Sequence, residues 1–169
     1  GLVIDGKSPV FNEPKELGLE AVTESKIEQA LTLIEGTEFE GAAVLVEDSG
    51  VFTYAFEGWP GANSADVEEK IGLDGVLNRI SKSKNKGGEY RAVVILSDGN
   101  NNWKTIGVCK GKFSDEKRGE NGFGYDPIFI PEEGDGRTFA EMESSAKSSI
   151  SHRGAAMKAL SSALGGPSK

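Results

Sequence analysis

The sequence has one cysteine and one histidine, its 19 basic residues are outnumbered by 27 acidic ones, and it contains no long hydrophobic run. Its single cysteine, Cys109, cannot form a disulfide within the chain, which fits a reducing compartment such as the cytoplasm. The formal net charge is -8 at pH 7, whereas binding to nucleic acid needs a basic surface that displaces counterions. No apolar run approaches the length that spans a membrane. We therefore expect a cytoplasmic protein with neither nucleic acid nor membrane as a partner.

Glycine, in contrast, is abundant. The chain has 23 glycines, where an average usage of about 7% would give about 12 in a chain of this length. Hydrophobic residues make up 37% and charged residues 27%, which is ordinary for a globular protein. The length of 169 residues predicts a single domain over residues 1–169 with many tight turns.

Strand-like and helix-like segments alternate along the chain, which predicts an α/β or mixed α+β fold. The predicted strands cover residues 1–5, 42–46, 90–99, 104–113 and 125–131, with a strand or short helix at 50–56. The strand at 42–46 is continuously apolar, so we expect it to be buried on both faces. Helices are predicted at 14–36, after caps at Ser64 and Asp74, and after a cap at Ser151, with Met157, Leu160 and Leu164 on one face of the last.

Two adjacent carboxylates, Glu47 and Asp48, follow the apolar strand predicted at 42–46 in "AVLVEDSG". Ligands of open α/β sheets bind beyond the carboxyl ends of strands, where we expect these acids to lie. Neighbouring residues on a strand point to opposite sides, so one acid would face the site and the other a neighbouring group. Such a carboxylate can bind Mg²⁺ or accept a proton from water. Alternatively, the pair closes the strand as a polar turn.

The stretch "GENGFGYDPIFIP" combines glycines with aromatic and acidic side chains. Gly122 and Gly124 permit a close backbone approach to a ligand. Phe123 or Tyr125 could stack on a planar base, and Asp126 could fix the loop or bind a ring N–H. The alternative is a glycine loop that leads into an edge strand.

The only histidine, His152, lies beside Arg153 at the predicted start of the last helix, five residues after Lys147. Free backbone N–H groups and basic side chains at a helix start suit an electron-rich ligand. The alternative is a solvated His–Arg pair on the surface.

Taken together, these stretches resemble the inosine/xanthosine triphosphate pyrophosphatases, a family that hydrolyses non-standard purine nucleoside triphosphates. The matching segments are "VLVEDSGVF", "GWPG" followed by Ser64, "YRAVV", "GFGYDPIFIP", "TFAEM" and "KSSISHRGAAMKAL", over about residues 10–164. The resemblance implies a long curved mixed sheet with flanking helices and two lobes around a nucleotide cleft, in a homodimer. It also implies Mg²⁺-dependent hydrolysis of ITP, dITP or XTP to the monophosphate and pyrophosphate, which cleanses the nucleotide pool.

The resemblance assigns roles to individual residues. Asp48 matches the general base and metal ligand, and Glu13, with Glu16 as second choice, is the candidate for a further metal-binding acid. The positions that match substrate contacts are Ser49, Phe123, Gly124, Tyr125, Asp126, Lys147, His152 and Arg153. A cationic or donor-rich pair at His152 and Arg153 would favour a 6-keto purine over adenine, because donors left without an acceptor are costly.

The sequence departs from the family pattern at its beginning. The family's first strand, glycine-rich phosphate turn and helix, about thirty residues in a unit of this kind, are not found. The opening "GLVIDGKSP" looks like the family's second strand, and "DGKS" lacks the upstream glycine of a phosphate loop, so it reads as a turn. Two alternatives therefore remain: a shortened or divergent member that binds nucleotide without turnover, and a related pyrophosphatase of different base preference.

Overall fold

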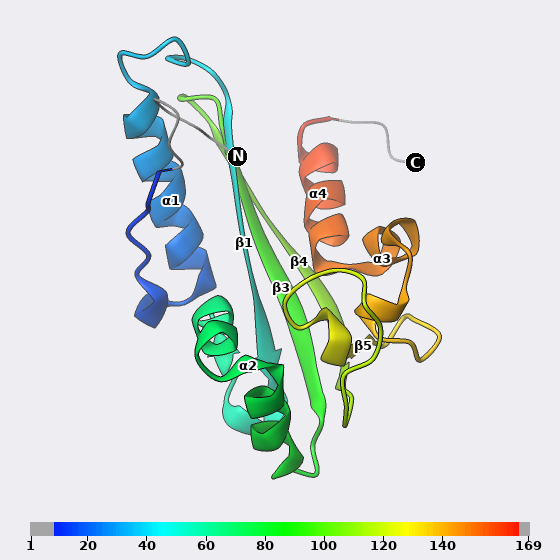
Figure 1. Ribbon diagram of the computed structural model, residues 1–169. Coiled ribbons are helices and arrows are strands. Elements are labelled where there is room, and N and C mark those ends of the chain that lie inside the picture. The colour runs from blue at the N-terminus through cyan, green and yellow to red at the C-terminus, as the bar shows by residue number, and fades with distance from the viewer. Residues whose placement is uncertain (1–8, 166–169) are drawn as a thin grey trace.

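The computed structural model describes residues 9–165 (Figure 1), so the strand and turn predicted within residues 1–8 lie outside the described part. The helices and strands are α1 (Leu19–Ile34), β1 (Val44–Thr53), β2 (Pro60–Gly61), α2 (Ser64–Ser81), β3 (Gly87–Ser97), β4 (Asn102–Phe113), β5 (Phe129–Pro131), α3 (Ser144–Ile150) and α4 (His152–Ala163). Short 3-10 helices occupy Lys15–Leu17, Tyr54–Phe56, Asp126–Ile128 and Phe139–Glu141. No helix within residues 9–165 is both long and apolar enough to cross a bilayer.

The strands form one five-stranded sheet in the order β2-β1-β3-β4-β5. Helices and sheet together confirm the mixed α/β class, but every strand pair in the described residues is antiparallel, where a mixed sheet was expected. The connection between β1 and β3 explains the difference. Its helix α2 stays at one end of the sheet (Figure 1), so β3 has to run back alongside β1. A parallel pair would need a connection that returns along the sheet.

Two helices cover opposite faces of the long strands (Figure 1). Under α1 lie the side chains of Val93 and Ile95, and under α4 lie those of Ala92 and Val94. This alternation along β3 follows from the two-residue period of a strand. A third cluster, at the end where β5 lies, is rich in aromatic rings and contains Tyr90, Phe113, Phe129 and Phe139.

Strand β1 is longer than predicted. It continues through Glu47 and Asp48 to Thr53, so the prediction that the two acids lie beyond the end of a strand was wrong. Ser49 and Gly50 are turn-forming residues, but both pair with β3, and this pairing outweighs their local preference. A Cβ at Gly50 would overlap the carbonyl oxygen of Gly61, which explains the glycine. Leu45 is 45% exposed, so the expected burial of this strand on both faces is also wrong.

The predicted helices are present with altered ends. The segment predicted at 14–36 is divided at Gly18, whose φ of 95° breaks the helix. The two helices predicted after Ser64 and Asp74 form α2, which is interrupted at Gly72. Ser64 does not cap α2, because its hydroxyl donates to the Gly61 carbonyl at 2.6 Å.

The last helix confirms its predicted cap but not its predicted apolar face. Ser151 Oγ accepts a hydrogen bond from the Gly154 N–H at 3.1 Å. Leu160 is buried as expected, whereas Met157 and Leu164 are exposed. The predicted strand at 125–131 likewise begins as a 3-10 helix, and only Phe129–Pro131 is extended.

Candidate functional site

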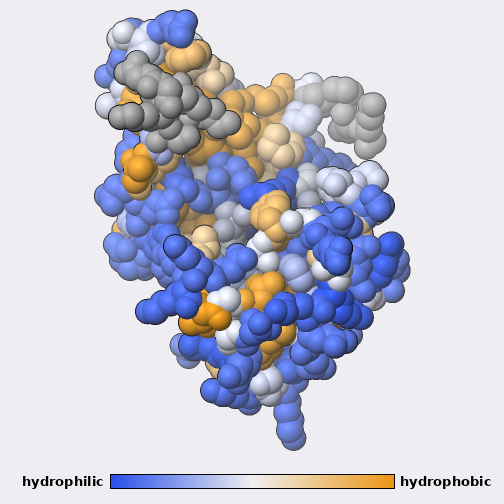
Figure 2. Space-filling view, in the orientation of Figure 1, coloured by the Kyte–Doolittle hydropathy of each residue, from blue (hydrophilic) through white to orange (hydrophobic). Residues whose placement is uncertain are grey.

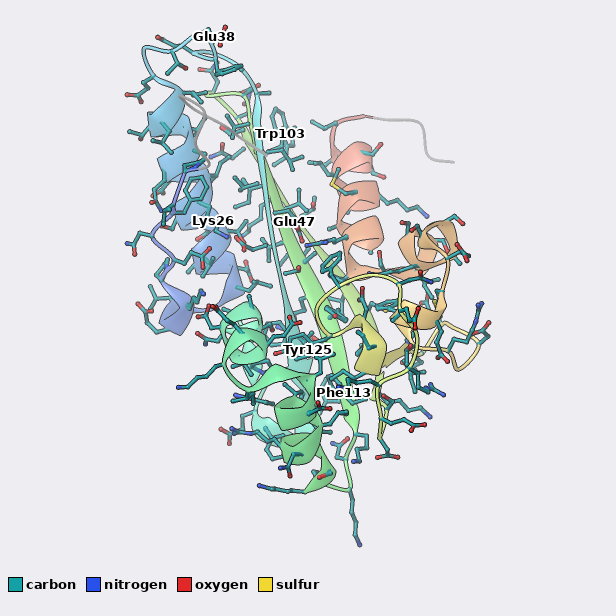
Figure 3. All side chains as sticks on the ribbon, in the orientation of Figure 1. Lys26, Glu38, Glu47, Trp103, Phe113 and Tyr125 are labelled. Atoms are coloured by element: carbon teal, nitrogen blue, oxygen red, sulfur yellow. The ribbon has the colours of Figure 1, made fainter. Side chains whose placement is uncertain are left out.

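The first turn of α4 places Arg153 against β1. Its Nε donates to Glu47 Oε1 at 3.0 Å, and its Nη2 donates to Ser49 Oγ at 3.3 Å. Glu47 and Ser49 are two residues apart on a strand, so both point to the α4 side of the sheet. Figure 3 shows Glu47 between β1 and α4. One of the two adjacent acids therefore contacts a neighbouring basic group, as the alternation predicted.

An exposed aromatic ring lies beside Arg153. The ring of Phe123 is 61% exposed, and its centroid is 4.8 Å from Lys147 Nζ and 4.9 Å from Arg153 Cζ. Cations at these distances are attracted to the ring face. The adjoining pocket of about 560 Å³ is lined by Asn121, Gly122, Phe123, Phe139, Met142, Ser144, Lys147, Ser148, Ser151, Arg153, Gly154 and Met157. Its size is in the range of small-molecule sites, and its aromatic and cationic groups suit an electron-rich planar ligand.

The loop that carries Phe123 is held by a buried carboxylate. Asp126, 2% exposed, accepts a hydrogen bond from the Phe123 N–H at 2.9 Å and forms an ion pair with Lys147. A Cβ at Gly122 would overlap Asp126 Oδ2, so this position requires glycine. These contacts give Asp126 the first of its two predicted roles, which is to fix the loop. Its contact with a ring N–H stays a prediction.

The two residues before Asp126 differ in their surroundings. Gly124 has a φ of 61°, a left-handed conformation that favours glycine. Tyr125 is buried in the aromatic cluster, and its hydroxyl donates to the Ser64 carbonyl at 2.8 Å. Tyr125 thus ties the loop to the start of α2, and its expected contact with the base also stays a prediction.

His152 is buried behind the pocket and is uncharged. Its imidazole, in a residue 4% exposed, stacks on Tyr90 with ring centroids 4.4 Å apart and planes 9° apart. Burial, with the charges of Arg153 and Lys147, lowers the pKa of His152 to about 3. Of the cationic or donor-rich pair expected at His152 and Arg153, Arg153 carries the positive charge, together with Lys147, and His152 does not. His152 Nδ1 is buried without a hydrogen-bond partner among residues 9–165.

Acid should destabilise the fold through His152. Its pKa is about 3 in the folded protein, against an ordinary value of 6.5 for histidine, so the unfolded chain binds more protons between these values. The free energy of unfolding should then fall by about 1.4 kcal/mol for each pH unit below 6.5. Urea unfolding between pH 6.5 and 5 measures this slope. A His152→Gln variant should show a shallower slope, and equal slopes in the two proteins would contradict the assignment.

A second cluster lies on the opposite face of β1, under α1. Lys26 Nζ is 2.7 Å from Asp48 Oδ1 and 2.6 Å from Glu13 Oε1, so one ammonium joins the two acids (Lys26 is labelled in Figure 3). Lys15 Nζ extends the cluster, at 3.2 Å from Glu13 Oε2 and 2.7 Å from Asp66 Oδ1. The structure therefore places Glu13 near Asp48, as expected. Glu16, the second choice, is exposed and has no ion pair among the described residues.

Lys26 is not among the site residues predicted from the sequence. A signal was available, because Lys26 lies at helical spacing between Val22 and Ala30, which are both buried against the sheet. A lysine at a core-facing position is unusual unless a carboxylate compensates it. That pattern points to an acid on the facing strand, which is Asp48.

Asp48 is suited to accept a proton. Burial raises its pKa, Lys26 opposes that change, and the nearby carboxylates of Glu13 and Glu47 raise the pKa further. Asp48 Oδ2 is buried and has no hydrogen-bond partner in the described part of the chain. Burial also raises the pKa of Glu13, but hydrogen bonds from Lys26 and Lys15 outweigh this and lower it. The cluster therefore contains Asp48, whose pKa is raised and whose Oδ2 has no partner in the described residues, beside Glu13, whose pKa is lowered.

These carboxylates also fit a magnesium ion. Within residues 9–165, no three His, Cys, Asp or Glu side chains converge as a metal cluster. Mg²⁺, however, is usually bound by one or two carboxylates together with water and substrate phosphates. Asp48 and Glu13 could supply these carboxylates, because both contact the Lys26 ammonium and therefore lie close together. Asp48 Oδ2 also has no hydrogen-bond partner among residues 9–165.

The two clusters are separated by the thickness of β1. In the described residues, Val44–Gly50 pair with β3 only, so the other edge of β1 is open there. A ligand that contacts both Arg153 and Asp48 has to pass this edge. The first turns of α2 border both clusters: Asp66 contacts Lys15, and Glu68 Oε2 lies 3.5 Å from where a Cβ of Gly124 would be.

Comparison with known proteins identifies the family. Residues 3–163 match the sequence model of the Ham1 family. The chain belongs to the Ham1 family. It is 44% identical over 116 residues to the dITP/XTP pyrophosphatase of Pyrococcus horikoshii, in an alignment that covers 69% of this chain and 62% of that protein. The enzyme of the same name from Methanopyrus kandleri is 44% identical over 119 residues, or 70% and 63% of the two chains.

Solved structures of Ham1 proteins share the fold. The Staphylococcus aureus Ham1 protein has a TM-score of 0.80 at 27% identity, over 92% of this chain and 80% of that one. A Ham1 protein from Coxiella burnetii has a TM-score of 0.78 at 28% identity with the same coverage. These findings confirm the family resemblance seen in the sequence. The aligned part of this Ham1 chain spans less than two thirds of the length of the two pyrophosphatases above.

Proposed function

We propose that this Ham1 chain hydrolyses non-standard purine nucleoside triphosphates, namely ITP, dITP and XTP, to the monophosphate and pyrophosphate. The printed names of the relatives from Pyrococcus horikoshii and Methanopyrus kandleri support this substrate class. The observation that carries the proposal is the exposed Phe123 ring between Lys147 and Arg153 at the pocket. A purine ring stacked on Phe123 would present its edge to these cations.

Base selection follows from the charge state of the pocket. The guanidinium of Arg153 has N–H donors only, so it favours a keto oxygen at purine position 6 over the amino group of adenine. An adenine amino group there would leave donor facing donor, and unpaired buried donors cost about 1–3 kcal/mol. His152 is uncharged, so it can contribute packing and a single hydrogen-bond donor or acceptor, but no positive charge.

Hydrolysis is assigned to the cluster under α1. Asp48 accepts the proton of the water that attacks the α-phosphorus, and pyrophosphate leaves. Lys26 holds Asp48 in position by its 2.7 Å contact and, together with Lys15, offsets phosphate charge. Mg²⁺, held by Asp48 and Glu13 with the phosphates, would neutralise the charge on the transferred group. Such hydrolysis would remove non-standard nucleotides, and we propose that it serves to cleanse the nucleotide pool of the cytoplasm.

A substrate panel tests the proposal. Pyrophosphate release is measured from inosine, deoxyinosine, xanthosine, adenosine and guanosine triphosphates, with Mg²⁺ and with EDTA. We expect turnover of the first three only, and its loss in EDTA. If the folded protein released no pyrophosphate but bound ITP in calorimetry, the non-catalytic alternative would be favoured. Turnover confined to other nucleotides would favour a pyrophosphatase of different base preference.

We also propose that the chain forms a homodimer. Helix α1 leaves part of the sheet uncovered, and the exposed side chains of Leu17, Ile106 and Val108 line a hollow there with Phe52. Exposed apolar groups gathered in one place mark interaction surfaces. Sedimentation velocity measures the mass, and a single species of 17.9 kDa at micromolar concentration would refute this assembly.

A further inference from the structure

One buried aromatic residue contacts both sides of the candidate base pocket. Tyr90 lies on β3, in the aromatic cluster, and is buried. Its ring face stacks on His152, whose neighbour Arg153 borders the pocket on one side. Its hydroxyl donates to Asp126 Oδ1 at 3.4 Å, and Asp126 holds Phe123 and Lys147 on the other side.

The orientation of the Tyr90 ring is itself determined by its neighbours. Phe129 packs edge-on against it at 4.9 Å between centroids with planes 80° apart, and Phe139 packs at 5.8 Å with planes 47° apart. Edge and tilted contacts of this kind fix a ring plane. The remaining face of Tyr90 is therefore presented to His152, and the imidazole adopts the same plane.

Hydrogen bonding through Nδ1 does not orient the imidazole. His152 Nδ1 is buried without a hydrogen-bond partner in residues 9–165. A buried polar atom usually has a partner that sets the direction of its side chain. Here the parallel stack on Tyr90, with planes 9° apart, is the contact that sets the ring plane.

From these contacts we infer that Tyr90 is a positioning residue, which sets the plane of His152 and the direction of Asp126 and so holds the two sides of the pocket in their mutual arrangement. The inference rests on the proposed function for its kinetic consequences only. Tyr90 does not line the pocket, so it acts through His152 and Asp126 and not on the nucleotide.

The test separates the two contacts of Tyr90. Tyr90→Phe keeps the stack and removes the hydroxyl, and Tyr90→Leu removes the stack. Because the chain has a single histidine, the imidazole NMR signals are unambiguous. We expect upfield-shifted His152 ring protons in the unsubstituted protein, with NOE contacts to the Tyr90 ring. The shift should persist in Tyr90→Phe and disappear in Tyr90→Leu.

The amide of Phe123 reports on the other contact. Since this N–H donates to Asp126, its chemical shift should change in Tyr90→Phe, while the His152 signals stay in place. With ITP as substrate, both variants should raise KM more than they lower kcat, about tenfold in KM for Tyr90→Leu. Phe113→Leu is the matched control, because Phe113 is buried in the same cluster and packs on Phe129 at 5.6 Å.

Several outcomes would overturn the inference. Absence of NOE contacts between His152 and Tyr90 in the unsubstituted protein would do so without any variant. Equal His152 shifts in Tyr90→Leu and Phe113→Leu would show that Tyr90 is a core residue only. An unchanged Phe123 amide in Tyr90→Phe would remove the role of the hydroxyl. Lack of ITP turnover in the unsubstituted protein counts against the proposed function, and the NMR results still decide the role of Tyr90.

Discussion

Replacement of Asp48 by asparagine should reduce pyrophosphate release from ITP by about 10²–10⁴-fold, the range typical for loss of a general base. The amide has the same shape as the carboxylate but cannot accept the proton of the attacking water. It also replaces one of the two candidate carboxylate ligands of Mg²⁺ by a neutral amide, which is a weaker ligand. Lys26 keeps its 2.6 Å contact with Glu13, so we expect the variant to stay folded. Initial rates in a coupled pyrophosphate assay, beside circular dichroism, measure both properties.

Glu47→Gln provides the contrast on the same strand. The substitution removes one negative charge from the neighbouring residue but on the opposite face, where Glu47 contacts Arg153 at 3.0 Å. A less firmly held Arg153 should raise KM for ITP and change kcat little.

If Asp48→Asn retained activity within about threefold, the general acid–base contribution of 10²-fold or more would be absent, and Asp48 would not be the base.

The second large effect is expected at Gly107, where β4 and α4 meet. A Cβ at this position would overlap the carbonyl oxygen of His152 and the backbone nitrogen of Ala156. Both obstacles are backbone atoms of a helix, so they cannot rotate away as a side chain can. Gly107→Ala should push α4 off the sheet and cost about 3 kcal/mol, the upper part of the range for overpacked sites. Urea unfolding measures the change in the free energy of unfolding.

The displaced helix should also impair the pocket, because His152 and Arg153 form its first turn. Gly134→Ala is the matched control. A Cβ at Gly134 would lie 3.0 Å from Pro131 Cγ and 3.1 Å from Met142 Cε, the free end of a flexible side chain, and 3.3 Å from the Pro131 carbonyl oxygen. This control should therefore cost much less than Gly107→Ala. Equal stability of the two variants would contradict the close packing of α4 on β4.

Local sequence patterns predicted much of the fold. The β3–β4 hairpin was recognisable because Asp98, Gly99 and the asparagines that follow form a turn between two apolar runs, and Asp98 Oδ1 accepts from the Asn100 and Asn101 N–H groups. The cap of α4 at Ser151 was recognisable for the same kind of reason, since its contact is three residues away. Interactions of short range are encoded in short segments.

The composition of the candidate site was also visible in the sequence, but its arrangement was not. Adjacent acids, a glycine loop with Phe123, and the His–Arg pair are recognisable as residue types in order. The alternation along a strand indicates that the two acids face opposite sides, but only the packing decides that Asp48 faces Lys26 of α1 and Glu47 faces Arg153 of α4. The strand was expected to end at these acids because Ser49 and Gly50 favour turns, and pairing with β3 overrode that preference.

By itself, then, the sequence determined the residue types, the order of the elements and the family, because these depend on local pattern and motif. The tertiary structure alone decided the antiparallel sheet, the division of the site between the two faces of β1, and the charge of His152. Each of these depends on groups far apart in the chain. His152 is uncharged because it is buried against Tyr90, 62 positions earlier, and a histidine at the start of an exposed helix would titrate near neutrality.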